Sequence, residues 1–249
     1  MSTDATTAAA STGGPQDARL RQTIATACRI LAHRGLVDGI LGHVSARVGD
    51  DRLLIRCRGE GERGLRRTRA SEVWEVTLDG DPVDLPDGFT PPNELPIHSE
   101  LYRQRPDVGA VIHAHPPAAL LAGLAGLEPR PVFGAFNIPA LQLARRGVPV
   151  YPRPVLITRA ELAREMVAAM GDADVCLLRG HGITVAASSV EAATVLACNL
   201  NQLLEVTVEL ARLGATPPDL DAADLDELPD LGSDFNDRLT WQALAAEVE

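Results

Sequence analysis

Two histidines close an apolar stretch in the middle of the chain. His113 and His115 follow the run 108–112, which is too short for a helix and is typical of a buried strand. Side chains two residues apart on a strand point to the same face, so both imidazoles could bind one ion. Zn, Fe, Ni and Cu all accept imidazole ligands. The alternative is a pair of polar residues on a solvated strand face.

A third histidine lies in a similar setting further along the chain. His181 stands between Gly180 and Gly182 in a second apolar strand, 175–185. Glycines on both sides allow backbone or ligand to come close to the ring. Three histidine ligands leave metal positions open, which is typical of a catalytic site. The sequence therefore predicts His113, His115 and His181 as metal ligands.

Glu94 and His43 are the candidates for acid–base chemistry. Glu94 lies in a Pro-rich loop before an expected helix, 97–104, and could be a fourth ligand or a proton shuttle. Its alternative role is a helix N-terminal acid that complements the dipole, and we favour the catalytic role. His43, between Gly42 and Val44, could contact substrate or donate a proton. A buried, hydrogen-bonded structural role for His43 is equally supported.

The expected elements make the chain an α/β protein. Glycine-punctuated residues 39–47 lead into a strand, residues 133–140 are expected as strand and loop, and Thr158 with Glu161 forms a capping-box signature. Hydrophobic periodicity predicts helices at residues 17–34, 116–125 and 189–213, and the capping box is expected to open another helix through about residue 170.

Length and composition indicate one large domain. The chain has 249 residues, of which 45% are hydrophobic, enough for a sizeable core. We expect a disordered tail over residues 1–16, a catalytic domain over 17–214, and an acidic, Pro-rich linker and tail over 215–249. Trp241 in that tail could pack on a neighbouring subunit, over the site, or on its own domain.

Several classes of function are excluded by composition. A net charge of −11 and few aromatic residues argue against nucleic-acid binding. No apolar run is long enough for a membrane span, and the N-terminal residues lack a secretory signal pattern, so a cytoplasmic protein is expected. The four cysteines are far apart and are expected to be reduced core residues. The sequence has no lysine, which excludes Schiff-base, pyridoxal-phosphate and P-loop chemistry.

The order of these motifs resembles the class II aldolase/adducin family. Glu94 is followed by His113-x-His115 after an Arg-Pro-Asp turn, and then by Arg-Gly-His181-Gly. The resemblance covers about residues 24–213. It implies a three-layer α/β/α fold with a mixed, largely antiparallel central sheet, and a homotetramer with interfacial active sites. It also implies that the three histidines bind a divalent metal and that Glu94 is the catalytic acid/base. Zn²⁺ is expected first, with Mn²⁺, Fe²⁺ or Co²⁺ as alternatives.

Departures from the sugar-phosphate aldolases indicate a different substrate. Pro92 and Asn93 replace a phosphate-binding serine pair, Arg58-Gly59 replaces Thr-Gly, and residues 132–134 lack the family's tyrosine proton donor. The Gly42-His43-Val-Ser variant resembles the decarboxylase branch, whose members act on hydroxylated aromatic or pyridine dicarboxylates. In that branch Arg58 is our first choice for binding a second carboxylate, because a guanidinium can bind it bidentately. Gly42, Gly59 and Asn93 complete the expected substrate contacts.

We therefore expect a metal-dependent decarboxylase of a hydroxylated aromatic acid such as 3,4-dihydroxyphthalate. The metal would stabilise an enolate-like intermediate. Three alternatives stay open: a metal aldolase acting on a non-phosphorylated hydroxy-keto acid, a non-haem iron oxygenase of an aromatic acid, and an adducin-like module without catalysis.

Overall fold

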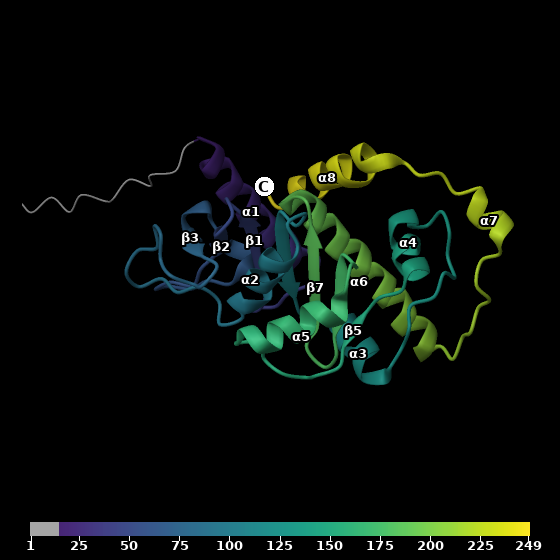
Figure 1. Cartoon of the computed structure of the whole chain (residues 1–249). Helices are drawn as coiled ribbons and strands as arrows, with labels where there is room; N and C mark the ends of the chain where they lie inside the picture. The colour runs from purple at the N-terminus through teal and green to yellow at the C-terminus, as the bar shows by residue number, and fades with distance from the viewer. Residues whose placement is uncertain (1–14) are drawn as a thin grey trace, which may run out of the picture.

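The computed structural model describes residues 15–249. The first helix, α1 (Pro15–His33), includes the last two residues of the predicted N-terminal tail, 15 and 16. The remainder of that predicted tail lies outside the described residues. α1 is followed by a central sheet with helices on both sides (Figure 1).

The sheet has seven strands in the order β3-β2-β1-β4-β7-β6-β5. Neighbouring strands are antiparallel except β5 and β6, which are parallel, so the expected mixed and largely antiparallel sheet is confirmed. The strands are β1 (His43–Arg47), β2 (Arg52–Arg56), β3 (Val73–Thr77), β4 (Ala110–Ala114), β5 (Val150–Tyr151), β6 (Val175–Leu178) and β7 (Gly182–Ala187).

Eight α-helices and three short helical turns accompany the sheet in the described part of the chain. The helices after α1 are α2 (Leu95–Gln104), α3 (Pro117–Ala125), α4 (Ile138–Arg146), α5 (Ala160–Met170), α6 (Val190–Arg212), α7 (Ala222–Asp226) and α8 (Thr240–Ala246). The turns are the 3₁₀ segments η1 (Leu65–Arg67) and η2 (Ala70–Glu72) and the π-helical segment η3 (Asp234–Leu239). The helices predicted over 17–34, 97–104, 116–125 and 189–213 are present within two residues at each end.

The two faces of the sheet pack against different helices. On β4, Ala110 and Ile112 face a buried apolar cluster shared with α1, α3 and α6. Val111 faces the opposite cluster, which is shared with α2 and α5. Because successive strand residues alternate between faces, His113 lies on the α2 and α5 side with Val111. The expected α/β/α layering is confirmed, and the histidine lies under α2.

Three local predictions were wrong in detail. Residues 175–185 form an antiparallel hairpin, β6 and β7, instead of one interrupted strand, and His181 is in its turn. Residues 133–140 contain no strand, because the Asn137 side chain caps α4 by accepting from the Ala140 amide. α5 begins after Arg159 without a side-chain cap, so the Thr158 capping box is not formed.

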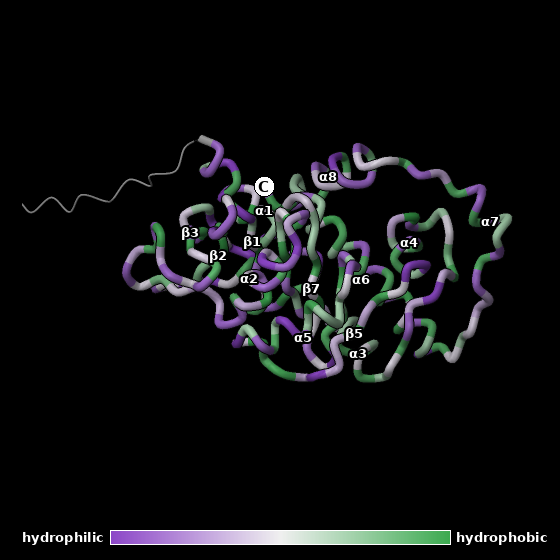
Figure 2. Tube along the Cα trace, viewed as in Figure 1, coloured by the Kyte–Doolittle hydropathy of each residue, from purple (hydrophilic) through white to green (hydrophobic). Residues whose placement is uncertain are grey.

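The C-terminal segment leaves α6 and returns to the body of the domain. In Figure 1 it runs from the end of α6 past α7 and back to α8, beside α1. Figure 2 shows hydrophilic stretches around α7. Trp241 and Leu244 of α8 pack against Ile30 and Val195, so this tail packs on its own domain. No helix within residues 15–249 has both the length and the apolar character needed to cross a membrane.

Candidate metal centre

Four side chains from three separate parts of the chain converge at the end of β4. Glu94, His113, His115 and His181 each offer one ligand atom, and these atoms all lie within 4.8 Å of one another. The Nε2 atoms of His113 and His115 are 2.7 Å apart, and Glu94 Oε2 is 3.4 Å from His113 Nε2 and 3.5 Å from His181 Nε2. The predicted ligand set is therefore brought together by the fold.

The β4–β7 pairing orients His113. Its ring is completely buried, and its Nδ1–H donates to the backbone carbonyl of Ile183 at a distance of 3.0 Å. A hydrogen bond at Nδ1 assigns the lone pair of the neutral ring to Nε2, the nitrogen that faces the cluster. The ring is thus held in the tautomer that a metal ligand requires.

The tight turn between β6 and β7 places His181 opposite the end of β4. Gly182 pairs closely with β4, and a Cβ atom at this position would lie 2.2 Å from the Ala114 carbonyl oxygen. Gly180 has a φ angle of +67°, which side chains rarely adopt. Both glycines that flank His181 are required by this turn. They bring the ring centroid to 4.8 Å from the rings of His113 and His115.

Glu94 is at the N-cap position of α2, but its side chain does not cap the helix. One carboxylate oxygen accepts a hydrogen bond from the Ile157 amide at 2.8 Å, and the other faces the histidines. The carboxylate is buried, and the alternative role as a helix-dipole acid does not explain why it points into the cluster. Burial raises its pKa, but the nearby imidazoles of His113 and His181 outweigh burial and hold the pKa below its usual range.

Burial also keeps His113 and His115 neutral. Loss of hydration, with a contribution from neighbouring imidazoles, lowers the pKa of His115 to about 3. Burial lowers the pKa of His113 too, against the raising effect of Glu94. Neutral imidazoles and an ionised carboxylate are the forms that bind a metal ion.

The buried polar atoms fit a divalent cation. Both ring nitrogens of His181 are buried and have no hydrogen-bond partner among the described residues. Leaving such groups unpaired costs roughly 1–3 kcal/mol each, and a bound ion removes that cost for a nitrogen that ligates it. Three imidazoles and one carboxylate suit Zn²⁺ and related transition metals better than Mg²⁺ or Ca²⁺. The four cysteines are free, and burial raises the pKa of each thiol to about 12. They therefore do not offer the thiolate that a metal ligand requires.

His43 lies next to the cluster without belonging to it. Its backbone pairs with that of His113 in the β1–β4 register, and the two ring centroids are 4.9 Å apart. Gly42 before it has a φ angle of +83°, and a Cβ atom there would lie 3.0 Å from the His113 carbonyl oxygen. The close approach of β1 to β4 therefore depends on Gly42.

The expected substrate contacts lie around the loop that carries Glu94. Arg58 forms a backbone bridge with Thr90, four residues before Glu94, with N–O distances of 2.9 and 2.8 Å. Arg58 and Gly59 are half-buried, and Asn93 is exposed. The pairing brings Arg58 to the Glu94 loop. Its role in binding a carboxylate, like those of Gly42, Gly59 and Asn93, stays a prediction.

Sequence reasoning missed a set of buried polar residues behind His43. His98, Ser45 and Tyr102 form a continuous hydrogen-bonded chain with it. A usable signal was present, because Glu94, His98 and Tyr102 recur every four residues and so share one helical face.

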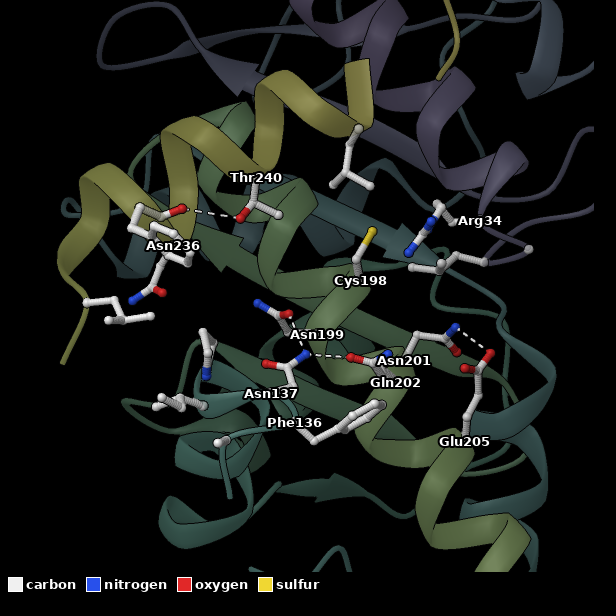
Figure 3. A pocket seen from close by; sticks show the side chains of 18 of the residues that line it. Arg34, Phe136, Asn137, Cys198, Asn199, Asn201, Gln202, Glu205, Asn236 and Thr240 are labelled. Atoms are coloured by element: carbon white, nitrogen blue, oxygen red, sulfur yellow. Dashed lines mark hydrogen bonds between the residues drawn. The ribbon is translucent and has the colours of Figure 1, made fainter. Parts of the chain in front are cut away.

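A separate pocket borders the long helix α6 (Figure 3). It has a volume of about 710 Å³ and lies between α6, the start of α4 and the C-terminal helices. Amide side chains meet in it, with Asn137 donating to Asn199 and Gln202 (Figure 3). None of the four clustered ligands lines this pocket.

The fold and the site define the class: a three-layer α/β/α domain with a candidate metal centre of three histidines and a glutamate. Residues 22–208 match the model of the family described as "Class II Aldolase and Adducin N-terminal domain". The chain belongs to this family. Divalent-metal dependence is general in the family, in agreement with the cluster.

Curated relatives and solved structures agree with this assignment. The chain is 53% identical over 231 residues to a 3,4-dihydroxyphthalate decarboxylase of Arthrobacter keyseri, covering 92% of this chain and 93% of the relative. It is 51% identical to a protein of the same name from Terrabacter sp. (strain DBF63), covering 92% and 96%. An aldolase II superfamily protein from Pseudomonas syringae has a TM-score of 0.78 at 23% identity, covering 96% and 95%, and shows the same fold.

Proposed function

We propose that this protein is a metal-dependent decarboxylase of 3,4-dihydroxyphthalate. One observation carries the proposal: two relatives with that name are more than half identical to the chain over nine-tenths of its length. The chain also brings together four side chains that could hold the metal ion of such a reaction. A non-catalytic, adducin-like module has no requirement for buried, unpaired histidine nitrogens.

The reaction requires stabilisation of negative charge on carbon. The bond between the ring and one carboxyl group breaks, its electron pair stays on the ring carbon, carbon dioxide leaves, and a proton takes its place. A divalent ion supplies electrostatic stabilisation for charge that develops on an adjacent substrate oxygen. His113, His115 and His181 would hold that ion, and Glu94 would serve as a fourth ligand or as the acid that protonates the ring.

Residues outside the metal centre would bind and orient the dihydroxyphthalate substrate. His43 is buried beside the cluster and is placed to act on substrate as an acid or hydrogen-bond donor. Arg58, half-buried beside the Glu94 loop, would bind the second carboxylate through a charge-assisted pair. Asn93, Gly42 and Gly59 would complete this binding surface.

The same proposal includes the identity of the metal ion, the oligomeric state and the cellular compartment. Zn²⁺ is our first choice from the donor set, with Mn²⁺, Fe²⁺ or Co²⁺ as alternatives. We propose a homotetramer with interfacial active sites in the cytoplasm, serving the degradation of aromatic acids. Large apolar side chains left exposed in the single chain support association, among them Phe136 at 66% and Leu213 at 70% exposure.

The test is a product assay with the full-length protein in its metal-loaded and chelated forms. With 3,4-dihydroxyphthalate, the loaded protein should release one carbon dioxide per dihydroxybenzoate formed. The chelated protein should be inactive until Zn²⁺ is returned. Parallel reactions contain pyruvate with an aldehyde, to detect aldol chemistry, and an oxygen electrode, to detect oxygenation. Aldol product or oxygen uptake without carbon dioxide release would replace the proposed reaction with one of these alternatives.

A further inference from the structure

A chain of buried polar side chains runs from His43 away from the candidate metal centre. His43 Nδ1 is 2.6 Å from His98 Nε2, and His98 Nδ1 is 2.6 Å from Ser45 Oγ. Ser45 Oγ is in turn 2.8 Å from the Tyr102 hydroxyl. All four side chains are at most 3% exposed. Every hydrogen in this chain must therefore find an acceptor inside the protein.

Strand β1 and helix α2 each contribute two of these hydrogen-bonded side chains, and the period of each element places its two on one face. His43 and Ser45 are two residues apart on β1, so they share a strand face. His98 and Tyr102 are four residues apart on α2, so they share a helix face. The register of β1 with β4 pairs His43 with His113 and Ser45 with Val111, which is the sheet face covered by α2. The chain therefore starts beside the metal centre and ends under the helix.

The tyrosine at the far end fixes the direction of the hydrogen bonds. Burial raises the pKa of Tyr102, so its phenol keeps its hydrogen. Among the described residues, the side-chain partner of that hydroxyl is Ser45 Oγ. Tyr102 then donates to Ser45, and the Ser45 hydroxyl donates to His98 Nδ1. With Nδ1 accepting, the neutral His98 bears its hydrogen on Nε2 and donates it to His43 Nδ1. In the reverse direction, the buried phenol hydrogen would have no acceptor within residues 15–249.

We infer that His98 is a positioning residue that holds His43 as a neutral Nε2–H tautomer, ready to donate a hydrogen bond to an anionic oxygen of the substrate. A neutral imidazole can act as an electrophilic hydrogen-bond donor in catalysis, and its orientation depends on the partner of the other nitrogen. Burial lowers the pKa of His98 to about 3, which keeps this partner neutral. The tautomer follows from the geometry, whereas its use on a substrate rests on the proposed decarboxylase function.

The tautomer can be read directly by nitrogen-15 NMR of histidine-labelled, Zn²⁺-loaded, full-length protein. Long-range nitrogen–proton correlations distinguish Nε2–H from Nδ1–H imidazoles, and a His43→Gln spectrum identifies the His43 signals. The wild type should show His43 as Nε2–H. An Nδ1–H signal for His43 in the wild type would overturn the inference without any variant, and whether or not the protein decarboxylates anything.

Variants at His98 and Tyr102 then test the cause. His98→Leu should abolish the single His43 tautomer and lower kcat about a hundredfold, the usual loss for one oxyanion donor, with metal content unchanged. His98→Gln, whose amide can still donate to His43 Nδ1, should restore the tautomer and most of the rate. Tyr102→Phe should partly mix the tautomers, and the control Tyr151→Phe should not, because that buried tyrosine donates to Glu165 instead. An unchanged His43 tautomer in His98→Leu would overturn the inference, as would a lost tautomer in His98→Gln.

Discussion

The two faces of the central sheet are equally buried but contain different chemistry. On the face covered by α1, α3 and α6, strands β1 and β4 contribute Val44 and Ile112 to a continuous apolar cluster. On the face covered by α2 and α5, the neighbouring residues on the same strands are His43 and His113. One step along either strand therefore changes the environment from an apolar core to a polar site.

This difference teaches how a single domain can hold a candidate metal centre without losing its core. Because side chains alternate on a strand, one face can supply burial energy while the other carries polar groups at fixed spacing. Burying a single unpaired polar group costs free energy. Here most of the polar groups form hydrogen bonds with one another or belong to the candidate metal centre. Substitutions on the two faces should therefore separate stability from function.

The largest effect is expected for His113→Ala on the polar face. Removing this buried ligand should abolish bound metal and turnover together, because the ring contacts both Glu94 and His115. Metal analysis by mass spectrometry and a carbon dioxide assay on the same sample provide the measurement. Normal activity in metal-free His113→Ala protein would refute the proposed centre.

The adjacent residue on the apolar face should give the opposite result. Ile112→Ala removes a fully buried side chain and should lower the free energy of unfolding by about 2–5 kcal/mol. Metal content and kcat of the folded protein should stay near wild type. Urea denaturation and kinetics below the transition measure the two quantities. Loss of metal without loss of stability would show that the faces are not independent.

Glu94→Gln should affect the rate more than the structure. The amide is nearly the same size and can still accept from the Ile157 amide, but it cannot supply the charge or the proton. We expect kcat to fall about a hundredfold, or ~3 kcal/mol, with metal retained. Steady-state kinetics with metal analysis test this expectation, and an unchanged kcat would remove Glu94 from the mechanism.

Per pH unit, the smallest expected effect is an acid sensitivity that originates on the polar face. Burial lowers the pKa of His98 from 6.5 to about 3, so the unfolded chain binds a proton in this range and the folded protein does not. With respect to His98, the folded protein therefore has its full free energy of unfolding above pH 6.5. As the pH falls from 6.5 towards 3, that free energy decreases by up to ~1.4 kcal/mol per pH unit. His98→Gln should flatten this part of the curve of unfolding free energy against pH. An identical slope in wild type and variant would contradict the assignment.

Much of the fold and the ligand set followed from local patterns. The period of two in β4 placed His113 and His115 on one face, and the glycines around His181 indicated a close approach. Helices α1, α2, α3 and α6 were predicted because their apolar spacing is a local property. α4 was missed, because its signal is a single asparagine cap after a loop.

The sequence by itself determined which residues could bind a metal and which face of each strand or helix they occupy, because side-chain direction follows from backbone period. Only the tertiary structure decided that Glu94 reaches His113 and His181, and that His98 on α2 meets His43 on β1. Those contacts depend on the register of β1 against β4 and on the packing of α2 across the sheet. Such pairings join residues far apart in the chain, and no local pattern specifies them.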